Sequence, residues 1–599
     1  TRGTRTAFRS TNTLSYDFKK FFKNNKNHLN LLAGQEYIVT RERELRNVVH
    51  GFPTEYTADD CINYSTKGNP YEVTNYGYPD DVLFSFFGRA NYDFDSKYLF
   101  SATFRADGSS KFSPNHRWGY FPAGAFAWRL SDEPFMENTK NWLDNLKVRL
   151  SYGLSGADNI DSNLWKETWT SSTVSFNGIT YSGYKPNGML SNPDLKWETT
   201  TSRNLGIDFG FMGNRLAGSI DVYWNTTKDL LMCVPIDETT GYSYQYQNIG
   251  QTSNKGIELS LNYDIVRTKD FSFGISATYN YNHNNIDKLS GNIIAQYGSQ
   301  WASSSTSPAY DYLFKEGSPV GLIRGFISDG YYSTNDFNYD ASTGVYTLRE
   351  GVADIASSIT GNYPSPFKVA DGQNAFPGAL KLRNLNPEED NLVDSDDVAD
   401  LGEVMPKHTG GFNLNATWKG IDFSAGFAWA AGGHVYNVNS LINMYGNKDT
   451  GLGANKLAFV NNCYQLYEVQ NGELIPVTTP DALNALNANA KYSVPYMENG
   501  VVYSTFVEDA SYLRLNTLTI GYTLPKTWSK KAGMQKARLY ATAGNLFTIT
   551  GYSGVDPEVN ADPNKSTTSN NKGKYPMLGM DYGTYPRART FTFGVNIEF

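Results

Sequence analysis

The sequence predicts an all-β fold, a transmembrane antiparallel β-barrel of about fifteen strands. The clearest strand covers residues 589–599, where apolar and polar side chains alternate. A period of two places the two sets on opposite faces of a strand. A soluble β-sandwich gives the same pattern, but a last strand that ends on an aromatic residue is typical of the aromatic girdle of a membrane barrel. The apolar set is Phe591, Phe593, Val595, Ile597 and Phe599.

The composition favours the same fold class. The 599 residues are 15% aromatic and 19% charged, include 54 glycines, and have a mean hydropathy of -0.48. That hydropathy is typical of soluble proteins, yet a barrel also produces it, because only alternate residues of its strands meet lipid. No run of about 18 apolar residues is present, so we expect no transmembrane helix. The start at Thr1, without Met or a signal peptide, predicts a fragment or processed chain with a part upstream.

Alternating segments of about ten residues recur along the whole chain. In residues 97–105, for example, Tyr98 and Phe100 share one face, whereas Ser101 and Thr103 share the other. Turn signals such as Asp95-Ser96 and Lys419-Gly420 separate neighbouring segments. The expected strands are residues 6–18, 28–40, 84–94, 97–105, 118–130, 146–155, 204–211, 215–225, 256–265, 271–279, 408–418, 421–431, 511–524, 537–548 and 589–599.

The connections between these strands alternate strictly between short and long. Outer-membrane barrels have this asymmetry, with short periplasmic turns and long extracellular loops. Because bacterial single-chain barrels have an even number of strands, an odd count predicts that this chain does not close alone and that leading strands are missing. The long extracellular loops are expected at residues 41–81, 156–199, 226–252, 281–407, 432–510 and 549–586.

Seven segments spread over the chain resemble SusC-like TonB-dependent outer-membrane transporters, the SusC/RagA family. They are Ser85–Met136, Leu146–Gly156, Asn192–Phe211, Asn254–Tyr263, Gly317–Tyr331, Tyr512–Pro525 and Ala537–Phe547. The resemblance implies that residues 1–599 are the C-terminal part of a 22-stranded barrel. A signal peptide, a plug domain and a TonB-contacting segment would precede Thr1, so the plug is missing from this sequence.

The resemblance also implies a function. We expect an importer barrel in the outer membrane of a Gram-negative bacterium, which takes up oligosaccharides from glycan breakdown with TonB and a SusD-like lipoprotein lid. Transporter-lipoprotein pairs of this family are expected to dimerise. The alternatives are a peptide importer of the same family and an outer-membrane binding or adhesion barrel that transports nothing. No nucleic-acid partner is expected.

Signals for enzyme chemistry are nearly absent. The six histidines show no H-E-x-x-H pattern or close pairing, and neither G-x-S-x-G nor a phosphate loop occurs. Cys61, Cys233 and Cys463 lie far apart and show no metal spacing, so we interpret them as isolated thiols. We therefore expect no enzyme.

The outer loops instead offer aromatic residues that suit sugar rings, whose apolar faces stack while their hydroxyls form hydrogen bonds. For any single residue the alternative is that it packs the loops together or contacts a partner. The candidate substrate-binding residues are Trp165, Trp169, Tyr242, Tyr244, Tyr246, Tyr297, Trp301, Tyr310 and Tyr312.

The loop at 281–407 is strongly acidic, with about ten more acidic than basic residues between Asp287 and Glu403. We therefore expect neutral oligosaccharides to be preferred over sulfated ones. Relatives carry an acidic run after a Pro-Gly dipeptide that is similar to a calcium loop, but after Pro377-Gly378 the turn glycine is gone. A solvated acidic loop is the alternative to a Ca²⁺ site. The candidate metal ligands are Asn384, Asn386, Asp390, Asp394, Asp396 and Asp397.

The resemblance gives the terminal strand a further role as the signal recognised by the barrel-assembly machinery. The residues expected to carry that signal are Phe591, Phe593 and Phe599.

Overall fold

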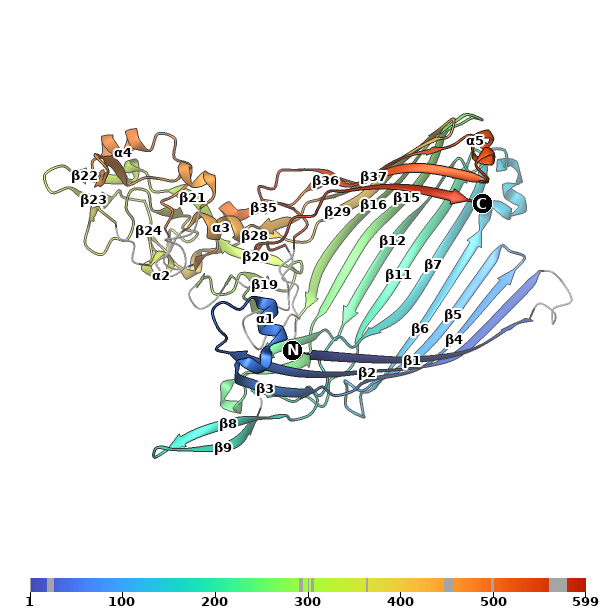
Figure 1. The fold of residues 1–599 in the computed structure, drawn as a ribbon, viewed down its shortest axis with the longest axis horizontal. Helices are drawn as coiled ribbons and strands as arrows, with labels where there is room; N and C mark the ends of the chain where they lie inside the picture. The colour runs from blue at the N-terminus through green and yellow to red at the C-terminus, as the bar shows by residue number, and fades with distance from the viewer. Residues whose placement is uncertain are drawn as a thin grey trace. The chain divides into compact units, whose positions relative to one another are not determined.

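Two units, each containing long antiparallel β-strands, make up the chain (Figure 1). The first comprises residues 1–214 and 219–255, and the second comprises residues 215–218 and 256–599. The structure is a computed structural model. It describes residues 2–18, 26–186, 188–289, 295–299, 301–302, 306–361, 365–445, 456–496, 500–559 and 579–599.

In the first unit, each long strand pairs antiparallel with the next long strand along the chain. The connection at Asp95 and Ser96 is tight, and both residues have positive φ, 56° and 54°. This backbone is that of a type I′ turn, whose twist matches that of the flanking strands. The long strands are β1 (Arg2–Asp17), β2 (Asn27–His50), β4 (Asp81–Phe94), β5 (Tyr98–Ser109), β6 (Trp118–Arg129), β7 (Leu143–Ala157), β11 (Glu198–Phe211) and most of β12 (Leu216–Lys228).

The second unit repeats this up-and-down order. Lys419 and Gly420, with φ of 46° and 91°, close its tightest hairpin. Its long strands are most of β15 (Gln251–Arg267), then β16 (Phe271–Lys288), β29 (His408–Trp418), β30 (Ile421–Ala431), β36 (Tyr512–Thr523), β37 (Lys536–Thr550) and β38 (Thr590–Glu598).

The predicted fold class is confirmed. Eight long strands in the first unit and seven in the second, counted over the described residues, reproduce the fifteen expected. The hairpin of β29 and β30 has the predicted bounds, 408–418 and 421–431. Alternation located these strands because one of their faces is apolar over the whole span.

The predicted start of the loop at 41–81 is wrong, because β2 continues to His50 and pairs there with β3 (Asn69–Gly77). Strand ends also reach into the predicted loops 226–252, 281–407 and 549–586, at Lys228, Lys288 and Thr550. Ladder hydrogen bonds require no apolar face. Strands can therefore extend past the lipid-facing span with polar residues on both faces, where alternation no longer marks them.

The strict alternation of connection lengths also fails at one place. The connection from β5 to β6, residues 110–117, is shorter than the next one from β6 to β7, residues 130–142. The latter contains two short 3-10 helices, Leu130–Asp132 and Pro134–Thr139. Connection length alone therefore does not assign every loop to a side.

Large apolar side chains stand exposed along one face of the long strands. On β38 the exposed fractions of Phe591, Phe593, Val595 and Ile597 lie between 48% and 79%, and that of Phe599 is 80%. The same holds for Phe100 and Phe104 on β5 and for Leu205 and Ile207 on β11. Apolar surface of this extent marks a contact with lipid or with another protein.

The long connections of the first unit contain several small elements. A β-hairpin, β8 with β9, projects from one of them (Figure 1), and three short strands form a separate sheet in the order β10-β14-β13. These elements are α1 (Ala58–Asn63), β8 (Trp169–Phe176), β9 (Ile179–Pro186), β10 (Met189–Leu190), β13 (Leu231–Pro235) and β14 (Tyr244–Asn248).

The long connections of the second unit, residues 289–407 and 432–511, are here called the outer region. Many of its apolar side chains are buried in a core of its own, among them Ile323, Phe326, Tyr346 and Leu441. Its small sheets join distant segments, as where β18 pairs with β34. The elements are β17 (Ala295–Tyr297), β18 (Thr306–Ser307), β19 (Tyr312–Phe314), β20 (Leu322–Phe326), β21 (Ser328–Tyr331), β22 (Phe337–Asp340), β23 (Val345–Leu348), β24 (Asp354–Ile355), α2 (Ser357–Thr360), β25 (Lys368–Val369), β26 (Leu380–Leu382), β27 (Leu392–Val393), β28 (Val398–Glu403), β31 (His434–Tyr436), α3 (Val438–Met444), β32 (Tyr467–Gln470), β33 (Glu473–Pro476), α4 (Pro480–Leu486), β34 (Gly500–Val501) and β35 (Val507–Asp509).

One further helix, α5 (Lys526–Lys531), lies in a short connection beside the start of β37 (Figure 1). Within the described ranges, no helix has both the length and the apolar character needed to span a membrane.

Candidate functional site

The predicted aromatic residues of the first unit differ in their surroundings. Trp169 begins the β8–β9 hairpin and is 58% exposed. The Tyr242 hydroxyl donates to Glu167 Oε1 at 3.0 Å, and this hydrogen bond raises the pKa of Tyr242. Tyr244 is half-buried on β14, and Tyr246 on the same strand is buried. The Lys166 ammonium lies 4.6 Å from the Trp165 ring centroid. Of these five, Trp169 offers the most open ring.

The predicted aromatic residues of the second unit also separate into two kinds. Tyr310 is exposed, whereas Tyr312, two residues later on β19, is buried. Trp301 is half-buried, and Tyr297 lies in β17, although its side chain is not among those described. Among the described side chains of this set, Tyr310 alone has its ring open for a ligand in the way predicted.

Asp311, which lies between Tyr310 and Tyr312 in the sequence, is fully buried. Its carboxylate accepts hydrogen bonds from the Ser299 backbone N–H at 2.7 Å and from the Ser299 hydroxyl at 2.5 Å. Burial raises the pKa of Asp311 to about 6, although these hydrogen bonds oppose the shift. Asp311 therefore ties two segments of the outer region together, and sequence alone gave no sign of this role.

The acidic run holds itself together through backbone hydrogen bonds. The buried Asp397 carboxylate accepts from Leu385 N–H at 2.5 Å and from Asp394 N–H at 2.9 Å. Asp394 Oδ1 accepts from Asp396 N–H, and Asp390 Oδ1 accepts from Leu392 N–H. In the same run, Asn384 accepts from Asn386 N–H.

These contacts bear on the expected Ca²⁺ site. Calcium takes six to eight oxygen ligands. Across the described part of the chain, no group of three or more His, Cys, Asp or Glu side chains is arranged to hold a metal. The Ca²⁺ site stays a prediction.

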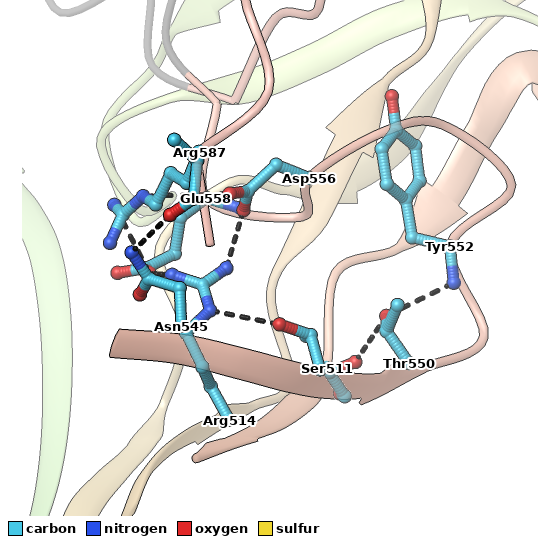
Figure 2. Close-up of polar contacts among 10 residues, drawn as sticks. Ser511, Arg514, Asn545, Thr550, Tyr552, Asp556, Glu558 and Arg587 are labelled. Atoms are coloured by element: carbon cyan, nitrogen blue, oxygen red, sulfur yellow. Dashed lines mark hydrogen bonds and ion pairs between the residues drawn. The ribbon is translucent and has the colours of Figure 1, made fainter. Parts of the chain in front are cut away.

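A buried ion cluster that sequence reasoning missed lies where β36 meets the connection from β37 to β38 (Figure 2). Arg514 is 2% exposed. Its guanidinium donates to Asp556 Oδ1 at 2.6 Å, to Glu558 Oε2, and to Thr548 Oγ1 at 3.0 Å. Arg587 approaches the same two carboxylates, at 3.4 Å from Asp556 and 3.2 Å from Glu558. Two guanidinium groups thus face two carboxylates, which satisfies the buried charges.

A cavity of about 590 Å³ borders this cluster. Most of its lining is apolar, including Met405, Trp429 and Val435, and its polar groups include Glu558 and Arg587. Glu558 and Arg587 pair with each other, and Thr409, His434 and Tyr512 also line the cavity. A volume and lining of this kind are typical of small-ligand sites. No motif marks the cavity in the sequence, because its walls come from separate strands and loops.

The first unit carries polar rows on the other face of its long strands. Thr11, Glu36, Ser85 and Asp107 are successive cross-strand partners on β1, β2, β4 and β5. Arg105 joins this row, with guanidinium nitrogens 2.9 Å from Glu36 and 2.7 Å from Asp107. A second group joins Arg149 to Asp208 and Asp221 across three strands. A cavity of about 440 Å³ lies on this unit and includes Asn30, Asn91, Ser101 and Asn204 in its lining.

An apolar exposed face, a polar opposite face and long connections define a β-barrel of the outer-membrane type. A model of the TonB-dependent receptor-like β-barrel family matches residues 1–546, and the chain belongs to this family. The predicted family, fold class and outer-membrane location are thereby confirmed.

Two curated relatives are similar over most of the chain. The TonB-dependent receptor P3 of Formosa agariphila is 30% identical over 603 residues, which cover 98% of this chain and 52% of that protein. The TonB-dependent receptor SusC of Bacteroides thetaiotaomicron is 30% identical over 526 residues, which cover 87% of this chain and 44% of that protein. The chain therefore spans about half the length of the curated relatives it matches.

Among solved structures, the RagAB peptide importer in its closed-closed state matches with a TM-score of 0.71 at 24% identity. The match covers all of this chain and 56% of that chain, and it shows the fold alone. The relatives are receptors and transporters, as expected for a chain that is not an enzyme.

Proposed function

We propose that this chain forms the C-terminal part of the barrel of a TonB-dependent nutrient importer, which works with a plug domain and TonB. The observation that carries the proposal is the pairing of two opposite faces on the same long strands. In the first unit, one face exposes Phe104 on β5 and Leu150 on β7, and the other face carries the adjacent Arg105 and Arg149 in ion pairs. Such a wall separates lipid from a polar interior.

Oligosaccharides are the first proposed cargo. Exposed rings on long connections support it, namely Trp169 in the first unit and Tyr310 in the second. Rings of this kind can stack on sugars. The negative charge of the segment from Asp287 to Glu403 supports neutral rather than sulfated sugars, because a cleft lined by one sign of charge repels ligands of that sign.

Peptides are the second candidate, and the cavity beside Arg514 favours them. Its wall is mainly apolar, and Glu558 already accepts from Arg514 and forms an ion pair with Arg587. An apolar side chain of a peptide would gain by burial against this wall. A similar structure carries the name RagAB peptide importer.

We also propose a SusD-like lipoprotein as the lid and a dimer of such pairs. Long connections with exposed apolar residues support a partner on the outer side, for example Val469 and Leu474 on the β32–β33 hairpin. A non-transporting adhesion barrel remains the alternative class.

Uptake by cells that produce the full-length receptor with its lipoprotein tests the proposal. We expect TonB-dependent uptake of neutral oligosaccharides, and deletion of the TonB-contacting segment should abolish it. Titration calorimetry with neutral oligosaccharides, sulfated oligosaccharides and peptides of matched size then assigns the cargo. Uptake that survives the deletion would contradict the importer proposal, and tighter binding of sulfated sugars at low and moderate salt would contradict the charge argument.

A further inference from the structure

The short connections of the second unit form one continuous rim. Lys419 N–H donates to Asp270 O at 3.0 Å, which joins the turn after β15 to the turn after β29. Thr523 N–H donates to Gly420 O at 2.7 Å, and Gln535 N–H donates to Glu598 O at 2.7 Å. These bonds extend the contact through α5 to the end of β38. We call residues 267–270, 418–421, 524–537 and 597–599 the short-connection rim.

This rim is basic, whereas the whole chain has a formal net charge of -8. Apart from the chain terminus, its carboxylates are Asp270 and Glu598. Within the part of the chain that the structure describes, Lys526, Lys530 and Lys531 of α5 make no ion pair. Ser529 is the buried residue of that helix, and the three lysines are exposed. The cations of the rim are Arg267, Lys269, Lys419, Lys526, Lys530, Lys531 and Lys536.

Exposed aromatic rings lie among these cations. Trp418 is 54% exposed, Trp528 on α5 is 61% exposed, and the Lys419 ammonium lies 6.0 Å from the Trp418 ring centroid. Next to the rim, β36, β37 and β38 expose Ile520, Leu539 and Val595. The basic rim is thus continuous with the apolar face that we assign to lipid.

We infer that the short-connection rim binds the phosphate groups of anionic phospholipids in the periplasmic leaflet of the outer membrane. Short connections of outer-membrane barrels are periplasmic. Tryptophan rings settle at the depth of the headgroups, while lysine side chains extend their ammonium groups to the charged layer. The positive charge of α5 complements an anionic surface, and the attraction falls off within a Debye length. This inference goes beyond the proposed function and does not depend on the cargo.

The test uses the intact receptor in nanodiscs of phosphatidylethanolamine with a minor share of phosphatidylglycerol. Native mass spectrometry counts the phosphatidylglycerol molecules that stay bound to the receptor after it is released from the nanodisc. The K526Q/K530Q/K531Q variant should retain less phosphatidylglycerol, on the order of fivefold less per lysine removed. Retention of phosphatidylethanolamine should stay unchanged.

The matched control is K67Q/K185Q/K368Q, which removes three exposed lysines from long connections. It should retain phosphatidylglycerol like the unmodified receptor. Equal phosphatidylglycerol retention in both triple variants would overturn the inference and would favour an acidic periplasmic protein as the partner of the rim. If the α5 variant does not insert into the membrane, the salt dependence of phosphatidylglycerol retention tests the inference instead. Phosphatidylglycerol retention by the unmodified receptor must fall as ionic strength rises, and a constant value would overturn the inference.

Discussion

The last strand of the chain and the outer region use apolar residues in opposite ways, although both belong to the second unit. On β38, Phe593 is 79% exposed, whereas Phe326 on β20 is fully buried. Strand β38 relies on lipid to cover its side chains, whereas the outer region buries Phe326 in a core of its own. The difference teaches that one chain can combine a membrane wall with loops that fold by the rules of water-soluble domains.

Truncating one phenylalanine in each place gives the largest expected contrast. Phe326→Ala should destabilise the outer region by about 3–5 kcal/mol, because it leaves a cavity in a packed core. Phe593→Ala should leave the outer region unchanged, because its ring contacts no part of that core. Hydrogen exchange of residues 306–361 measures the effect. Equal protection in the two variants would contradict an independent core.

Arg514→Ala should cost a similar amount, about 3–5 kcal/mol, because the buried Asp556 carboxylate loses its closest guanidinium. The matched control is Arg538→Ala, which breaks a more exposed pair with Asp422 and should cost less. Hydrogen exchange of residues 551–559 and 579–587 reports whether the connection opens. Adding Asp556→Asn should restore part of the loss, and a double variant less stable than Arg514→Ala would argue against the charge explanation.

A lysine placed on each face of β15 in turn tests which face contacts lipid. Leu259→Lys should cost about 2–4 kcal/mol near the membrane midplane, whereas Ser260→Lys should cost little. The fraction of heat-modifiable folded barrel in membranes is the measurement. Equal tolerance at the two neighbouring positions would remove the lipid-facing assignment of Leu259.

The outer region should respond to pH through Asp311. Its folded pKa, about 6, lies above the ordinary value of 3.8, so the native state binds more protons between these two values. Stability should therefore fall as pH rises through this window, by about 1 kcal/mol between pH 5 and pH 7. Asp311→Asn should remove the dependence. Hydrogen exchange at both pH values measures the free energy of local opening. If this free energy changes with pH as much in the Asp311→Asn variant as in the unmodified protein, another group causes the pH dependence.

Deleting Phe599 should have the smallest effect on the stability of the folded barrel, because its ring is 80% exposed. It should nevertheless lower outer-membrane insertion of the full-length protein far more than Glu598→Ala does, since the terminal aromatic residue is the expected assembly signal. Surface labelling compares the two variants. Unchanged surface levels after the deletion would count against that role.

The sequence by itself determined the long strands. Alternation over residues 408–418 and 421–431, together with Lys419-Gly420 between them, predicted a hairpin that the structure reproduces. This worked because a strand between lipid and a polar interior repeats its pattern every two residues, and the turn chemistry is local. Alternation predicted an end of β2 at residue 40, but the strand continues to His50 with polar residues on both faces.

Tertiary structure alone decided the fate of the loop residues. Tyr310 and Tyr312 look alike in sequence, yet the first is exposed and the second buried. Arg514 meets Asp556 and Glu558 across more than forty residues of chain, and no local pattern predicts such a meeting. Loops without a repeated pattern bury side chains according to which distant segments pack against them, so their contacts depend on the whole fold.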